Sequence, residues 1–203
     1  MTLSKRLFDL VFALLLVAIL ALPTLALCLW LLARSGRPLF YRSERMKGVD
    51  QPFQLWKFRT MTVEAGDTGV SGADKATRIT PTGRILRRYR LDEIPQLWNI
   101  LKGDMSFVGP RPPLRQYVQR FPDLYARVLR SRPGLTGLAT LRFHRHEEWL
   151  LARSTSREVT DLIYSRACVP RKGHLDLIYQ ENQTLCFDIA IVIETILRVL
   201  RRH

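Results

Sequence analysis

Two adjacent carboxylates, Asp92 and Glu93, begin a segment whose apolar residues recur at helical spacing up to Gly103. The pattern predicts a helix with Asp92 as its N-cap residue and Gly103 at its end. A helix N-terminus attracts anions, because its first N–H groups have no partner within the helix and its dipole is positive there. Acidic residues are also ordinary at helix starts, so the pair alone favours a structural role over a catalytic one.

An arginine between prolines follows these carboxylates along the chain. Pro110 and Pro112 restrict the backbone on both sides of Arg111, and a guanidinium held in this way suits the bidentate binding of phosphate. A second basic pair, Lys57 and Arg59, is two residues apart in a predicted strand, so both side chains are expected on one face. That face is either a solvated basic edge or an anion-binding surface.

These residues belong to sequence blocks that resemble the monotopic phosphoglycosyl transferases, a family of bacterial sugar transferases. The order and spacing of the blocks agree from the amino terminus to about Gly137, and the length is similar to that of small members with a catalytic domain only. The matching blocks are Lys57-Phe58-Arg59-Thr60-Met61, Leu91-Asp92-Glu93, residues 101–112 and Arg132-Pro133-Gly134-Leu135-Thr136-Gly137.

The resemblance implies a chemistry. Members of this family transfer a sugar 1-phosphate from a UDP-sugar to a polyprenyl phosphate, usually undecaprenyl phosphate, and release UMP in the first membrane step of exopolysaccharide, lipopolysaccharide or other glycoconjugate synthesis. Asp92 would be the nucleophile that forms a covalent phosphosugar intermediate, and Glu93 would help to bind Mg²⁺. The implied substrate-binding cations are Lys57, Arg59, Arg87 and Arg111.

The carboxyl-terminal third departs from the family pattern. After Gly137 the chain has a different sequence over residues 138–148 from the Trp-Ala-Gln stretch of many members, so the resemblance does not extend to the identity of the sugar. Asp161, with Tyr164, resembles a later Asp-x-x-Tyr element of the family. This match predicts that Asp161 contacts the nucleotide of the substrate.

The segment from Leu10 to Leu32 is apolar apart from Pro23 and Thr24, and it is long enough to cross a bilayer as one helix. Pro23 predicts a break in that helix. Basic residues flank both ends, which favours the cytoplasmic side for each. The residues alone support a single span and a re-entrant hairpin equally. The resemblance favours the hairpin, because family members insert this helix as a re-entrant hairpin broken near a proline.

The composition limits the class of protein. The chain has 203 residues and a formal net charge of +14, which suits one domain with an anionic partner such as nucleic acid, acidic lipid or a phosphorylated substrate. A hydrophobic content of 47% excludes a disordered protein. The three cysteines include no CxxC pair, so we expect reduced thiols and neither a disulfide scaffold nor a zinc ribbon.

We expect an α+β, mainly helical fold with two parts. Residues 1–36 are expected to form an amino-terminal re-entrant membrane helix-hairpin, and residues 37–203 a small cytoplasmic catalytic domain with interfacial helices and a minor β-element. A helix expected over residues 185–200 fits a core helix and a helix at the membrane surface equally well. Further expected elements are strands over residues 39–41 and 53–59, flanking a polar loop, and a helix over residues 83–89.

The resemblance also implies partners and a location. It implies a UDP-sugar, a polyprenyl phosphate and membrane phospholipid as partners, no nucleic acid, and leaves a homodimer open. The location would be the bacterial inner (cytoplasmic) membrane, with the active site on its cytoplasmic face. The alternative is a non-catalytic, membrane-anchored basic protein that binds acidic lipid or nucleic acid. That alternative accounts for the charge but not for the Asp92-Glu93 pair.

Overall fold

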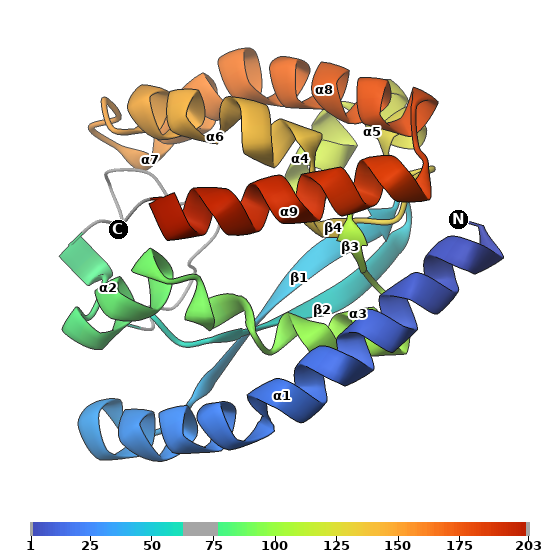
Figure 1. The fold of residues 1–203 in the computed structure, drawn as a ribbon. Coiled ribbons are helices and arrows are strands. Elements are labelled where there is room, and N and C mark those ends of the chain that lie inside the picture. The colour runs from blue at the N-terminus through green and yellow to red at the C-terminus, as the bar shows by residue number, and fades with distance from the viewer. Residues whose placement is uncertain (1, 63–76, 202–203) are drawn as a thin grey trace.

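The computed structural model describes residues 2–62 and 77–201. This part of the chain is mainly helical, with two small two-stranded sheets. Figure 1 shows helices α6, α8 and α9 on one side of the molecule and α1 and α3 on the other, with the strands between them. The mainly helical α+β class is therefore confirmed.

The amino-terminal helix α1 (Leu3–Ser35) contains the whole apolar segment. Among the described residues it is the one helix that is long and apolar enough to cross a membrane. The helix continues through Pro23, so the expected break into two arms is not seen, although Figure 1 shows that α1 changes direction along its length. Such a bend is the usual effect of a proline that removes one helical hydrogen bond. The re-entrant hairpin stays a prediction.

Strands β1 (Phe40–Gly48) and β2 (Gln51–Phe58) form an antiparallel hairpin with a tight turn. The predicted polar loop between two short strands is wrong, because both strands extend through that region. Cross-strand contacts explain the extension: Arg42 lies opposite Trp56, with its guanidinium 5.3 Å from the centre of the indole ring, and such a pair stabilises a hairpin.

The Asp92-Glu93 pair lies in a 3₁₀ helix, η2 (Leu91–Glu93), between α2 (Pro81–Arg88) and α3 (Gln96–Lys102). The prediction of one helix that begins at Asp92 is wrong. The N–H of Ile94 donates to the carbonyl of Leu91 at 3.3 Å, which is the tighter 3₁₀ pattern, and Pro95 has no N–H to continue an α-helix from this point. The predicted end is confirmed, since Gly103 closes α3 with a φ of 91°.

The rest of the domain is built from short helices around one parallel strand pair. Ser106 in β3 pairs with Gly134 in β4, and side chains at Gly109 or Gly134 would collide with the facing backbone, which explains glycine at both positions. The further elements are β3 (Ser106–Val108), α4 (Arg115–Arg120), α5 (Pro122–Val128), β4 (Gly134–Thr136), α6 (Leu138–Leu151), α7 (Arg157–Ile163), the π-helical segment η3 (Tyr164–Cys168), α8 (Val169–Glu181) and α9 (Leu185–Arg201).

A buried cluster of charged and polar side chains joins α1 to the domain. The ammonium of Lys5 donates to Asp188 Oδ2 at 2.5 Å, and the Tyr179 hydroxyl donates to Asp188 Oδ1 at 2.6 Å. On the next turn of α1, Asp9 Oδ1 accepts a hydrogen bond from Ser106 Oγ at 3.1 Å. These contacts link α1, β3, α8 and α9, so the amino-terminal end of the apolar helix is part of the domain core.

We expect the substitution Asp188→Ala to lower the free energy of unfolding by about 3–5 kcal/mol, because it leaves the buried ammonium of Lys5 without its counter-charge. The measurement is thermal unfolding of the detergent-purified protein. Glu44→Ala is the matched control: Glu44 and Arg115 form an ion pair of 2.7 Å with about half-exposed side chains, and its loss should cost less than about 1 kcal/mol. Equal losses of stability in the two variants would contradict the proposed role of the buried Lys5–Asp188 pair in the stability of the core.

Candidate active site

The two carboxylates lie at the meeting point of three chain segments: the end of β2, the 3₁₀ helix η2 and the Pro-Arg-Pro turn. Asp92 and Glu93 are each 8% exposed. Arg90, directly before η2, has a left-handed backbone with a φ of 56°. A non-glycine residue in this conformation costs about 1–2 kcal/mol and is typical of a functional site.

Glu93 is surrounded by three cations from three different segments. Its Oε1 accepts a hydrogen bond from the Lys57 ammonium at 3.2 Å and lies 3.5 Å from Arg111 Nη2, while its Oε2 lies 3.2 Å from Arg90 Nη2. Burial alone would raise the pKa of Glu93, but these cations hold that pKa far below its ordinary value. Glu93 is therefore ionised and fixed in place.

Asp92 has a different environment. Its Oδ2 lies 4.0 Å from the Lys57 ammonium, and no hydrogen bond to its carboxylate is found among residues 2–62 and 77–201. Burial raises the pKa of Asp92, and the charge of Lys57 opposes that rise. A carboxylate that is buried near cations but not held by hydrogen bonds keeps its oxygen atoms available for nucleophilic attack.

Three of the four predicted phosphate-binding cations lie at the dyad. Lys57 and Arg111 contact Glu93. Arg87 donates from Nε to Thr60 Oγ1 at 2.9 Å, and Asp92 is the charge that acts on its pKa, which burial lowers. Arg59 lies elsewhere.

The guanidinium of Arg59 caps the end of α1. Its Nη2 donates to the carbonyl of Ser35 at 2.6 Å and to that of Gly36 at 3.3 Å. Because β2 ends at Phe58, Arg59 no longer follows the alternation of the strand and does not share the face of Lys57. Its predicted contact with substrate phosphate stays a prediction, and its observed contacts are those of a helix cap.

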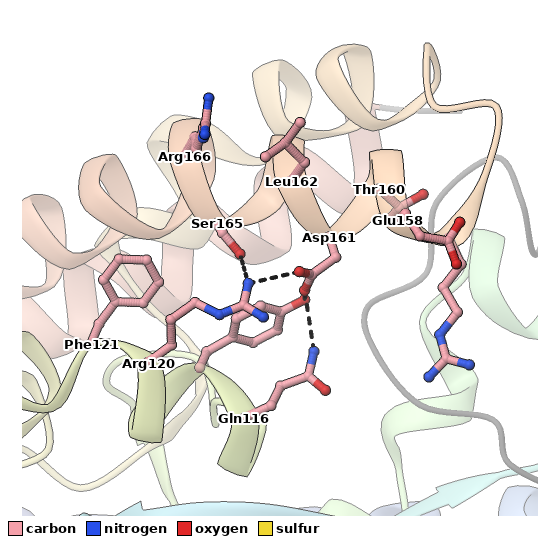
Figure 2. A pocket seen from close by; sticks show the side chains of 11 residues that line it. Gln116, Arg120, Phe121, Glu158, Thr160, Asp161, Leu162, Ser165 and Arg166 are labelled. Carbon is pink, nitrogen blue, oxygen red and sulfur yellow. Dashed lines mark hydrogen bonds and ion pairs between the residues drawn. The ribbon is translucent and has the colours of Figure 1, made fainter.

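Asp161 lies in a pocket of about 600 Å³ between α4 and α7 (Figure 2). The Tyr117 hydroxyl donates to Asp161 Oδ1 at 2.9 Å, and Arg120 Nη1 donates to Oδ2 at 2.7 Å and to Ser165 Oγ at 2.6 Å. No described contact joins Asp161 to the Asp92-Glu93 dyad. The predicted contact of Asp161 with a nucleotide stays a prediction.

Tyr117, which lines this pocket, contacts Tyr164. The rings of Tyr117 and Tyr164 are 4.7 Å apart, and the Tyr164 hydroxyl lies 3.4 Å from the ammonium of Lys172. Lys172 in turn donates to both carboxylate oxygens of Glu147, at 2.8 and 3.1 Å. Arg111 is close enough for Glu147 and Tyr164 to act on its pKa, so this chain of contacts reaches the active site.

Sequence reasoning missed several of these residues. Arg90 and Lys172 gave no signal, because their contacts depend on a left-handed backbone and on the packing of η3 against α8. Tyr179 did have a sequence signal, because the four residues Asp161-Leu-Ile-Tyr164 recur as Asp176-Leu-Ile-Tyr179. The tyrosine of the second copy donates its hydroxyl hydrogen bond to Asp188 in the core.

The available ligands for a metal ion are carboxylates. No group of three or more His, Cys, Asp or Glu side chains able to hold a metal occurs within residues 2–62 and 77–201. Mg²⁺ is commonly held by one or two carboxylates together with substrate phosphates and water. The adjacent carboxylates of Asp92 and Glu93 fit that mode of binding, in which the substrate completes the site.

Comparison with known proteins shows the family to which the chain belongs. A model of the bacterial sugar transferase family matches residues 1–202. The chain belongs to this family. It is 34% identical over 196 residues to an uncharacterized sugar transferase, EpsL, of Bacillus subtilis, covering 97% of this chain and 87% of the relative.

Two further relatives cover nearly the whole sugar transferase chain. The UDP-glucose:undecaprenyl-phosphate glucose-1-phosphate transferase of Caulobacter vibrioides is 37% identical over 199 residues, which are 96% of this chain and 68% of the relative. The exopolysaccharide production protein ExoY of Sinorhizobium fredii is 34% identical over 212 residues, covering 95% of this chain and 84% of the relative. These matches favour a transferase over a non-catalytic basic protein.

The two carboxylates of this sugar transferase should respond differently to loss of charge. We expect Glu93→Gln to lower the free energy of unfolding by about 3 kcal/mol, because Lys57, Arg90 and Arg111 then lose their common counter-charge. Asp92→Asn should change it by less than about 1 kcal/mol, since its carboxylate accepts no hydrogen bond from the described residues. Thermal unfolding of both variants tests this, and a larger loss for Asp92→Asn would refute it.

Proposed function

We propose that this protein transfers a sugar 1-phosphate from a UDP-sugar to a polyprenyl phosphate, undecaprenyl phosphate in the first instance, and releases UMP. The observation that carries the proposal is the contrast within the dyad: Glu93 is held by three cations, while Asp92 beside it is buried and free to attack. The relatives named for this reaction act on a UDP-sugar and undecaprenyl phosphate. The reaction would begin the synthesis of an exopolysaccharide or another glycoconjugate.

The chemistry would proceed in two displacements. A carboxylate oxygen of Asp92 attacks the β-phosphorus of the UDP-sugar, the bond from that phosphorus to the bridging oxygen breaks, and UMP leaves with the electron pair. An oxygen of the polyprenyl phosphate then attacks the same phosphorus and releases the Asp92 carboxylate. Lys57 and Arg111 lie where they would stabilise the negative charge on the phosphoryl oxygens in both steps.

Mg²⁺ would bind at Glu93, with the diphosphate of the substrate supplying further oxygen ligands. A bound Mg²⁺ would neutralise part of the negative charge of the diphosphate. Support comes from the donor set, since adjacent carboxylates suit this hard cation. The protein's own part is to hold the Glu93 oxygens in a fixed position through Lys57, Arg90 and Arg111.

The apolar helix α1 would enter the membrane and leave it on the same, cytoplasmic side. Near its start, Arg6 donates to the carbonyls of Ile100 and Leu101 at 2.7 and 2.8 Å. At its end, the Ser35 hydroxyl bonds to that of Thr82 at 2.8 Å. Because both ends contact one folded domain, a helix that crossed the bilayer would have to break one of these attachments.

The exposed apolar side chains support the same placement. They cover the outer side of α1 and part of α9, and an apolar surface of this extent is typical of contact with a membrane. Helix α9 would combine the two expected roles of core helix and membrane-surface helix, since its Ile191 is buried and other apolar residues of α9 are exposed. The exposed apolar residues include Leu7, Val11, Leu14, Leu15, Leu22, Leu25 and Leu29 on α1, and Ile189, Ile193, Ile196, Leu197 and Leu200 on α9.

The reaction is tested by UMP release from detergent-purified protein with Mg²⁺, undecaprenyl phosphate and a panel of UDP-sugars. We expect wild-type protein to release UMP with at least one donor, and Asp92→Asn to reduce the rate at least 10³-fold, because the amide is not a nucleophile for phosphorus. Mass spectrometry of wild-type protein quenched before acceptor is added should detect a phosphosugar on Asp92. Full activity of folded Asp92→Asn protein would overturn the proposed mechanism.

The membrane arrangement is tested by labelling single cysteines placed at residues 3 and 34 in bacterial cells. We expect both positions to be protected from a membrane-impermeant thiol reagent in intact cells and to react once the inner membrane is opened. A cysteine at an exposed site on the domain, such as Glu181→Cys, is the control for the cytoplasmic side. Labelling of residues 3 and 34 from opposite faces would establish a span and refute the re-entrant placement.

A further inference from the structure

Arg45, on strand β1, is a partly buried arginine that has no acidic partner within residues 2–62 and 77–201. It forms no ion pair with the residues that the structure describes. Its Nε donates to Ser43 Oγ at 3.4 Å and its Nη1 to the carbonyl of Pro112 at 3.5 Å, both of which are long for hydrogen bonds. The guanidinium therefore has unused donor capacity inside the protein.

The charged group that acts most strongly on the pKa of Arg45 has the same sign. Burial lowers the pKa of Arg45 to about 10, and the charge of Arg111 contributes to that shift. Two guanidinium groups in a partly buried place repel each other unless an anion lies between them. Glu93 does not fill this role: its Oε1 contacts Lys57 and Arg111, its Oε2 contacts Arg90, and no contact of Glu93 with Arg45 occurs among the described residues.

The fold holds Arg45 and Arg111 together at one turn. The N–H of Met46 donates to the carbonyl of Pro113 at 3.0 Å, which fixes β1 to the chain just after Arg111. On the hairpin, Arg45 projects from the same face as Lys57, because Lys57 lies opposite Tyr41, four residues before Arg45. The charge of Arg45 also acts on the pKa of Lys57, which burial lowers.

We propose that Arg45 and Arg111 together bind the phosphate that stays on the nucleotide, the α-phosphate of the UDP-sugar and the phosphate of the UMP product. This inference rests on the proposed function. When the bond to the β-phosphorus breaks, the electron pair remains on an oxygen of the α-phosphate, which gains one negative charge. Two guanidinium groups at that position stabilise the leaving group and hold the product.

The position of Arg45 favours the nucleotide over the lipid phosphate. Met46, the next residue, packs in a core cluster with Tyr117 and Tyr164 that contains no residue of α1. Arg45 Nη1 reaches the carbonyl of Pro112, and Tyr117 of that cluster is near enough to act on the pKa of Arg45, so the guanidinium extends toward the cluster that contains no α1 residue. Tyr41 and Tyr164 are near enough to act on the pKa of Arg45, and Tyr41 is about 40% exposed, so aromatic surface for a base adjoins the phosphate position.

The test is direct binding of UMP to the full-length protein in detergent, measured by isothermal titration calorimetry. We expect Arg45→Ala to weaken UMP binding at least tenfold and Arg45→Lys to weaken it less, since the charge is retained. Arg42→Ala is the matched control: it removes an arginine three residues away on the opposite face of β1, where the guanidinium packs on Trp56, and should leave UMP affinity unchanged. Thermal unfolding confirms that each variant is folded.

A second titration with farnesyl phosphate, a soluble prenyl phosphate, distinguishes the two sources of phosphate. Loss of UMP binding with farnesyl phosphate binding retained supports the assignment. Unchanged UMP affinity in folded Arg45→Ala protein, or a selective loss of farnesyl phosphate binding, overturns it. UMP release by wild-type protein, assayed in parallel with the UDP-sugar panel, tests the proposed function separately: turnover with an unaffected Arg45→Ala variant refutes the phosphate assignment and leaves the transferase activity standing.

Discussion

The charge of Glu93 is the interaction on which the arrangement of the site depends. It brings Lys57 from the hairpin, Arg90 from the strained residue before η2 and Arg111 from the Pro-Arg-Pro turn to one carboxylate. Without that anion, three cations from separate segments would repel one another in a partly buried space. A single acidic side chain therefore fixes three chain segments relative to Asp92, whose own carboxylate is left without hydrogen-bond donors among the described residues.

Buried hydrogen bonds and an ion pair also connect the apolar helix α1 to the site. Asp9 of α1 accepts hydrogen bonds from Ser106 Oγ and from the N–H of Phe107 in β3, and this strand leads directly into the turn that carries Arg111. Lys5, one turn earlier, is held by Asp188 of α9. Charged residues at the start of an apolar helix act here as core residues of the domain. The position of Arg111 therefore depends on the packing of α1 against β3 and α9.

The parts of the site that sequence reasoning identified are those fixed by neighbours in the chain. Asp92 and Glu93 are adjacent, and the prolines beside Arg111 restrict its backbone whatever the surrounding fold. Arg90 and Arg45 could not be found in this way, because the contacts of Arg90 depend on a left-handed φ and those of Arg45 on a turn 67 residues away in the sequence. Arg59 was placed with Lys57 by strand alternation, which fails where β2 ends at Phe58.

The secondary structure also divides into features that neighbouring residues determine and features that the apolar spacing alone does not predict. Helix α9 and the glycine end of α3 follow from apolar spacing and from glycine's access to positive φ, which are local properties. The start of α3 follows from Pro95, which has no N–H, and the length of the hairpin depends on cross-strand contacts such as the pairing of Arg42 with Trp56. One anionic position in the site, at Glu93, is filled by the protein itself. Among the described residues no acidic side chain pairs with Arg45, and this is the position at which we propose that the nucleotide phosphate binds.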